Sequence, residues 1–285
     1  AQRVKNLQRM AGLAGASGAP GATGTALKSA GPSAGYAGRI VARIHGARHG
    51  RYSAAGGASC RGEGEGVGAV VVGGGMPGIG AEDPGLSKFM MGAVFPLGLI
   101  LCGIAGADLF TGNTAYFIPP VMSRKMHVTS LLKNWTLVYT GNFIGALFVA
   151  WVLAYCTGIF ETSPWHDTIL KIAEVKTTAP FWKVFAKGIG ANWLVALAVW
   201  LGFAAKDIGS KILALWFPVM AFVAMGFEHS IANMFFIPTA MMYGAPVTWG
   251  EFIINNLIPA TLGNIVGGSL LTGGLYWYVF DRDNV

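Results

Sequence analysis

Two apolar stretches of this chain, each roughly as long as one membrane-spanning helix, are interrupted near the middle by a matching pattern of polar residues. The first reads FPLGLILCGIAGADLFTGNTAYFIPP from Phe95, and the second reads FPVMAFVAMGFEHSIANMFFIPTA from Phe217. Each begins Phe-Pro, carries an acid with an asparagine five residues further on, and then reaches Phe-Ile-Pro. A non-helical break inside a bilayer is tolerated only where it is buried or lines a cavity, because its backbone groups need partners. Matched breaks in two halves of a chain therefore predict a transport site.

The similarity between the two halves continues beyond the breaks. TGNFIGALF at 140–148 follows the first break, and LGNIVGGSL at 262–270 follows the second. A full apolar span at 180–204 precedes the second break, so the first half should have a counterpart ending near residue 80. The residues there, RGEGEGVGAVVVGGGMPGIG, form a short and glycine-rich apolar run. We therefore expect the first span to be truncated or replaced. The competing explanation of the breaks is a pair of structural helices kinked by Pro or Gly.

The composition agrees with a protein that crosses a membrane several times. Hydrophobic residues make up 53% of the chain and charged residues only 12%, against about 25% in a soluble domain. Apolar blocks at 135–160, 180–204 and 253–280 are long enough to span a bilayer as helices. The expected fold class is therefore an all-α, multi-pass membrane protein.

The net charge of +7 is concentrated at the N-terminal side, and so it does not indicate a nucleic-acid-binding protein. Residues 1–57 contain eight Lys and Arg residues and no acid, while the rest of the chain is close to neutral. We divide the chain into a basic leader, 1–60, and a transmembrane domain, 61–285. An Arg- and Ser-rich leader without acids is typical of a transit peptide, which favours a plastid envelope over the plasma membrane. A disordered tail or translated non-coding sequence is equally compatible with this composition.

Five motifs, spread over residues 95–268, carry a resemblance to a known family. They are FPLGLIL (95–101), DLFTGN (108–113), ANWLVALAVW (191–200), GFEHSIANMF (226–235) and NLIPATLGNIVGG (256–268). Together they resemble the formate/nitrite transporter family, and GGGMPGIGAEDPGLSKFMMGAVFP from Gly73 is similar to its plastid and eukaryotic-type members. The resemblance implies six spans in an aquaporin-like inverted three-plus-three repeat, with broken second and fifth helices. It also implies a homopentamer in which each protomer has its own pore.

His229 is the strongest candidate for the centre of a pathway. Ionisable residues are costly in a membrane and tend to face a polar route, and an imidazole can give a passing anion either a hydrogen bond or a proton. A satisfied core histidine is the plainer alternative. The family resemblance implies that Thr111 supplies a hydroxyl opposite His229, that Asn264 holds or faces the histidine, and that Lys176 attracts anions at a vestibule. A solvated or snorkelling lysine is an equal alternative for Lys176.

The acids at the two breaks are expected to be structural. Glu228 adjoins His229 and would repel anions if it faced a pore, so we expect it to point into the protein and satisfy backbone donors of the break. Asp108 should do the same in the first half, and Asn113 and Asn233 complete the two breaks. By resemblance, the cytoplasmic-side constriction consists of Leu99, Leu109 and Phe222, and the other constriction consists of Phe95 and Val195. The alternative is that these five side chains only pack.

The resulting functional hypothesis is transmembrane movement of a small monovalent anion, nitrite or formate, with or without protons. No cofactor is expected, and Cys60, Cys102 and Cys156 have no metal-ligand spacing. An enzyme is not expected, since His229 has no Cys or Ser partner at suitable spacing. The alternatives are a truncated scaffold subunit that does not conduct, and the same fold carrying lactate or hydrosulfide.

Overall fold

The computed structural model describes residues 83–282, which form helices and connecting turns with no strand among them. The first broken segment and the helix after it contain α5 Pro84–Val94, α6 Leu97–Ala105, α7 Phe110–Tyr116, α8 Ile118–Met122, α9 Val128–Val149 and the π-helix η1 Ala150–Tyr155. Then follow α10 Trp165–Thr178, α11 Phe181–Ala204, α12 Ile208–Ala224 and α13 Ser230–Met242. The last helical run consists of α14 Trp249–Glu251, η2 Phe252–Leu257, α15 Ile258–Gly268, η3 Ser269–Gly274 and α16 Leu275–Phe280. The all-α prediction is confirmed.

Both predicted breaks are present. The first separates α6 from α7 and the second separates α12 from α13. Each contains a glycine with positive φ, Gly106 at 82° and Gly226 at 68°, in the left-handed region that other residues rarely adopt. These glycines let the chain leave one half-helix and turn into the next within a few residues.

Three helices are long and apolar enough to cross a membrane, judged by length and composition among the described residues. They are Pro84–Ile104, Val128–Tyr155 and Phe181–Ala204, while Ile208–Ala224 and Ser230–Met242 are shorter apolar helices. The run from Trp249 to Phe280, expected to span easily, is not one of the three, because its Asn and Gly residues lower its mean hydropathy. The predicted short first span at 58–80 and the leader lie outside the described residues.

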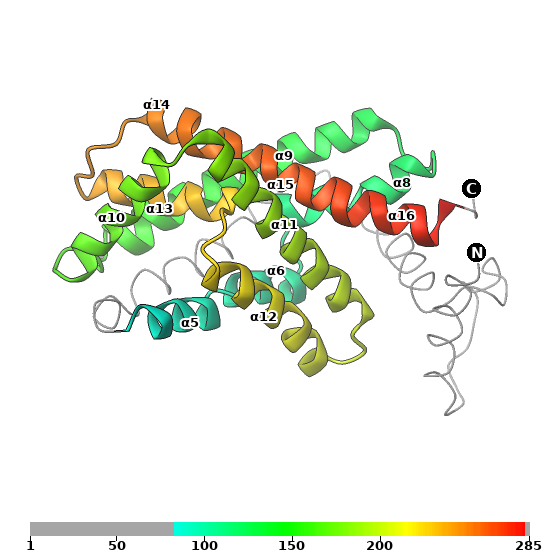
Figure 1. Ribbon diagram of the computed structural model, residues 1–285, viewed down its shortest axis with the longest axis horizontal. Helices are drawn as coiled ribbons and strands as arrows, with labels where there is room; N and C mark the ends of the chain where they lie inside the picture. The colour runs from blue at the N-terminus through cyan, green and yellow to red at the C-terminus, as the bar shows by residue number, and fades with distance from the viewer. Residues whose placement is uncertain (1–82, 283–285) are drawn as a thin grey trace.

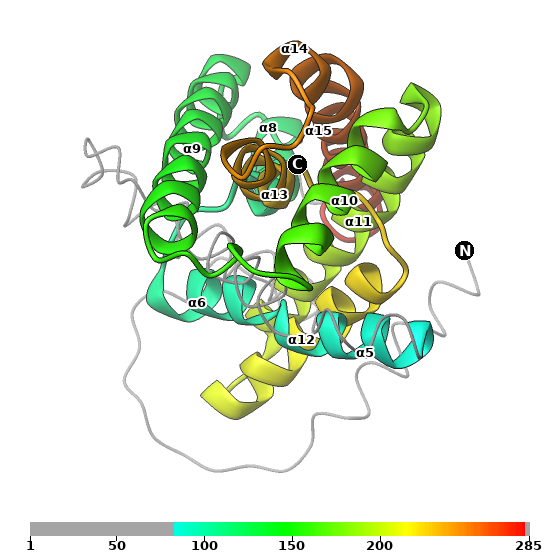
Figure 2. The ribbon, with the colours of Figure 1, turned by 90° about the vertical axis from the view of Figure 1, so that its left-hand side faces the viewer.

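The half-helix α13 occupies the centre of the helical bundle. Figure 2 shows it end-on, with α9, α10 and α15 around it. Every residue from Ser230 to Ala240 is buried. The helices α5 and α6 pack against α12 on one side of this group (Figure 1). The Trp216 indole nitrogen of α12 donates to the Ala93 carbonyl of α5 at 2.7 Å. The second break is thus held in the interior of the fold.

Close backbone contact joins α11 to α15, which cross each other in Figure 1. Gly263 of α15 lies directly against α11. A Cβ on Gly263 would overlap the Phe185 carbonyl oxygen and lie 3.0 Å from the Gly188 Cα. Small residues at such crossings allow two helix backbones to approach closely in a membrane.

Gly263→Ala is therefore expected to destabilise the fold by about 1–3 kcal/mol, because backbone atoms of α11 cannot move aside as a flexible side chain could. The measurement is the thermal unfolding midpoint of the detergent-purified protein. Gly250→Ala is the matched control, since its nearest neighbour would be the Thr248 hydroxyl at 3.8 Å. Equal midpoints for the two variants would contradict this account of the crossing.

Candidate functional site

His229 lies at the second break and is buried, with 2% of its surface exposed. It is the N-cap residue of α13, and its Nδ1 accepts a hydrogen bond from the Ala232 amide at 3.3 Å. Its Nε2 lies 3.0 Å from the hydroxyl of Thr111, which comes from α7 in the other half of the chain. Because Nδ1 accepts, the neutral ring carries its proton on Nε2 and donates it to Thr111. The two residues predicted to face each other do so.

Asn264 holds the backbone on both sides of His229. Its Oδ1 accepts from the Ser230 amide at 2.8 Å, and its Nδ2 donates to the Glu228 carbonyl at 3.0 Å. The same Nδ2 donates to the Gly188 carbonyl at 2.8 Å. Asn264 therefore holds the histidine through its neighbours' backbone and has no hydrogen bond to the imidazole itself.

Aromatic rings cover His229 on one side. The Phe222 ring is stacked with the imidazole at 5.7 Å between centroids, and Phe95 meets Phe222 edge to face at 5.8 Å. Phe95 and Phe222, which the resemblance assigns to different constrictions, are thus in ring contact beside His229. The two rings therefore form one apolar group. Leu99, Leu109 and Val195 are all buried in the same hydrophobic core.

Glu228 is buried in the protein, as expected, but its partners are side chains and not the backbone donors that we predicted. One carboxylate oxygen accepts from Lys176 Nζ at 2.8 Å and from Asn233 Nδ2 at 2.7 Å. Asn256 donates to the same oxygen at 3.4 Å and accepts from Asn233 at 2.7 Å. The Lys176 side chain is only 17% exposed, so it is neither a freely solvated lysine nor a snorkelling one. Its charge is instead balanced by Glu228.

Asp108 differs from its predicted role. Its side chain is exposed, and the Phe110 amide is bonded to the Asn142 side chain at 2.9 Å instead. The reason is that Asn142, on the facing helix α9, reaches the break and satisfies its backbone directly. Asn113 lies where expected, in the buried part of the break, and donates to Asn134 at 3.0 Å.

Several buried polar residues near the site carried no predicted role. Asn192 of α11 donates to the Thr114 hydroxyl at 2.8 Å and to the Asn264 carbonyl. Thr114 in turn donates to the Thr111 carbonyl at 2.7 Å, so this chain of bonds supports the backbone under Thr111. The signal that could have found these residues is the presence of Asn inside apolar helices, where an unpaired amide is costly.

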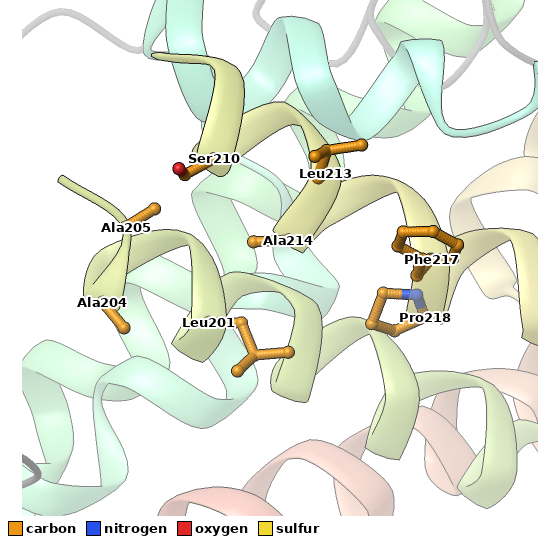
Figure 3. Close-up of a pocket in the computed structure, with 8 residues that line it drawn as sticks. All are labelled: Leu201, Ala204, Ala205, Ser210, Leu213, Ala214, Phe217 and Pro218. Carbon is orange, nitrogen blue, oxygen red and sulfur yellow. The ribbon is translucent and has the colours of Figure 1, made fainter. Parts of the chain in front are cut away.

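Two grooves on the surface of the described residues lie apart from these residues. Figure 3 shows one of about 470 Å³ between the end of α11 and α12, lined by Leu201, Ala204, Ala205, Ser210, Leu213, Ala214, Phe217 and Pro218. A second, of about 740 Å³, is lined by parts of α10, α11, η2 and the loop before α14. Neither includes His229, Thr111 or any predicted constriction residue. The buried His229–Thr111 contact, and not a surface groove, is the candidate site.

Comparison with known proteins identifies the family. The family model described as formate/nitrite transporter matches residues 61–278, which is most of the chain. The chain belongs to the formate/nitrite transporter family. This membership confirms the predicted family and fold. It also confirms the coarser functional prediction, that the chain is a membrane protein that transports anions.

Named relatives of this formate/nitrite transporter chain agree with that assignment. A probable formate transporter of Methanothermobacter thermautotrophicus is 46% identical over 229 residues, covering 75% of this chain and 83% of the relative. The formate channel FocA of Escherichia coli K12 is 38% identical over 227 residues, covering 73% and 79%. A solved pentameric formate channel with formate bound matches with a TM-score of 0.67 at 34% identity, covering 77% of this chain and 93% of that one.

Proposed function

We propose that this protein moves formate, and with it nitrite, across a membrane through a pathway in each protomer that passes between His229 and Thr111. The observation that carries the proposal is the 3.0 Å contact between His229 Nε2 and the Thr111 hydroxyl. This buried contact joins the two broken segments near the start of α7 in the first half and the start of α13 in the second. The names of the relatives favour formate as the first substrate to test.

The proposed chemistry uses two hydrogen-bond donors that can turn towards an anion. The neutral imidazole donates from Nε2, and the Thr111 hydroxyl, which accepts that bond at rest, has its own proton to donate. A small anion that inserts between them replaces one neutral bond with two charge-assisted ones. The N-terminus of α13 adds a favourable partial positive charge at the same place. Together these groups offset part of the cost of removing the anion from water.

The apolar surroundings give the site its selectivity in this proposal. Phe222 and Phe95 cover the histidine, so a hydrated ion of larger radius finds no polar lining to replace its water shell. The Lys176–Glu228 pair, which adjoins the histidine in the chain through Glu228, adds no net charge. The pathway therefore depends on hydrogen bonding at its centre and not on a fixed cation.

The test is uptake of labelled formate and nitrite into proteoliposomes that contain the wild-type protein, Thr111→Val or Thr111→Ser. The wild-type protein should take up the anion. The uptake rate of Thr111→Val should be about ten- to hundredfold lower, because a hydrogen bond to a charged group contributes about 1.5–3 kcal/mol. Thr111→Ser keeps the hydroxyl and should retain most of the flux. Flux in Thr111→Val equal to wild type would remove Thr111 from the pathway. Well-inserted wild type without flux would favour the non-conducting scaffold, and preference for lactate or hydrosulfide would change the substrate.

Assembly and location belong to the same proposal. A pentamer is supported by the pentameric relative, and the mass of the purified protein in detergent measures it directly. A plastid envelope location is supported by the basic, acid-poor leader alone. A fluorescent fusion that marks the plasma membrane would refute that location without affecting the transport proposal.

A further inference from the structure

The two breaks match each other residue by residue in the structure. Leu109 is the N-cap residue of α7 with φ −115° and ψ 124°, and His229 is the N-cap residue of α13 with φ −111° and ψ 115°. Each follows a positive-φ glycine by three residues, Gly106 or Gly226. Leu109 therefore holds in the first half the place that His229 holds in the second.

An asparagine clamps each of these two residues in the same way. Asn142 accepts from the Phe110 amide at 2.9 Å and donates to the Asp108 carbonyl at 3.1 Å, so it grips the backbone before and after Leu109. Asn264 makes the same two bonds before and after His229. Both clamps come from the helix that follows the broken segment, in TGNFIG and in LGNIVG.

A second pair of bonds repeats with the clamps. The Asn113 side chain donates to Asn134 at 3.0 Å in the first half, and Asn233 donates to Asn256 at 2.7 Å in the second. Asn134 precedes Asn142 by eight residues, as Asn256 precedes Asn264. Because both the clamp bonds and the Asn–Asn bonds repeat, the correspondence of Leu109 with His229 rests on several contacts of the fold and not on one.

The matched positions carry different kinds of side chain in the two halves, polar at one contact and apolar at the other. His229 meets Thr111, two residues after Leu109, in a contact between the two halves. The same relation applied in the other direction pairs Leu109 with Ile231, two residues after His229. Leu109 is 4% exposed and Ile231 is fully buried, and both belong to one apolar core. The repeat thus adds to the observed polar pair an apolar pair of Leu109 and Ile231, which the correspondence of the two halves predicts.

We infer that Asn142 is a positioning residue for Leu109, and that the Leu109–Ile231 pair it supports sets the size of anion that passes the His229–Thr111 pair. The inference rests on the proposed transport function. The clamp matters more in the first half than in the second. His229 also bonds the Ala232 amide with its own ring, whereas Leu109 has no polar atom to cap α7. Asn142 is therefore the side chain that fixes the conformation of Leu109.

The test is the ratio of lactate flux to formate flux in proteoliposomes, because this ratio does not depend on how many pores are active. Leu109→Ala should raise the ratio by about tenfold, since one to a few methyl groups in an apolar contact discriminate by about 10–200-fold. Asn142→Ala should also raise the ratio of lactate flux to formate flux. Asn142→Ala in the Leu109→Ala background should change it little further, since the clamp then has no large side chain to position.

Asn134→Ala is the matched control, because it removes an asparagine from the same helix that bonds Asn113 and not the backbone beside Leu109. Its ratio should stay at the wild-type value. An Asn142→Ala effect of equal size in both backgrounds, or an unchanged ratio with both fluxes reduced, would overturn the inference. If Asn142→Ala does not fold, Asn142→Asp is measured instead, as it keeps the bond from Phe110 and loses the one to Asp108. Absence of any wild-type flux would count against the proposed function and not against the clamp specifically.

Discussion

His229→Ala is expected to lower formate flux by about ten- to hundredfold per reconstituted protomer. The substitution removes the Nε2 donor from the polar pair, and a hydrogen bond to a charged partner is worth about 1.5–3 kcal/mol. It also removes the Nδ1 acceptor of the Ala232 amide, at 3.3 Å, and exposes that amide to an apolar interior. The measurement is the initial rate of labelled formate uptake at equal protein density.

Two further variants sharpen this result. His229→Gln restores a neutral donor without a titratable group, so partial recovery would assign His229 the role of hydrogen-bond donor. No recovery would assign it a role that needs the proton. His127→Ala is the control, because His127 is an exposed histidine before α9 that makes no capping bond with its side chain. A His229→Ala rate equal to that of His127→Ala would contradict a pathway at His229.

Lys176→Met is expected to destabilise the protein by about 3–5 kcal/mol, since it leaves the buried Glu228 carboxylate without its counter-charge. The lysine and glutamate side chains are only 17% and 8% exposed, and their charged atoms lie 2.8 Å apart. Asn233 and Asn256 would still donate to Glu228, but neither neutralises it. The unfolding midpoint in detergent measures the loss.

The double variant Lys176→Met/Glu228→Gln should recover most of this stability, because the pair is then neutral and Gln keeps an oxygen for the two asparagines. Lys183→Met makes the same substitution at an exposed lysine of α11 and should leave the midpoint near wild type. If Lys176 acts chiefly by attracting anions at a vestibule, Lys176→Met would instead slow formate uptake and leave the unfolding midpoint unchanged.

The sequence predicted those parts of the fold that depend on residues close together in the chain. Polar residues inside apolar segments revealed the breaks, and the repeat of acid, Asn and Phe-Ile-Pro revealed their pairing. Both features follow from the cost of unpaired backbone in a bilayer, which applies at each residue without knowledge of its neighbours in space. The short first span expected at 58–80 lies outside the described residues.

The contacts of the site were harder to predict. Asp108 and Glu228 occupy equivalent positions in the repeat, yet Asp108 is exposed and Glu228 is 6% exposed and bonded to Lys176. Nothing in the local pattern separates them, because the difference is made by a lysine 52 residues away from Glu228 in the chain. The same applies to Phe95 and Phe222, whose contact joins two segments that the sequence keeps far apart.

The sequence by itself determined that this chain is an α-helical membrane protein with two broken helices, and it singled out His229 as the ionisable group between them. The family resemblance already placed Thr111 and Asn264 beside His229. Tertiary structure alone decided that Asn142 clamps Leu109 as Asn264 clamps His229, and that Lys176 neutralises Glu228. The physical reason is that a break interrupts the helical period that would otherwise fix side-chain direction. The partner of each polar group is then chosen by distance between helices, which a linear pattern does not contain.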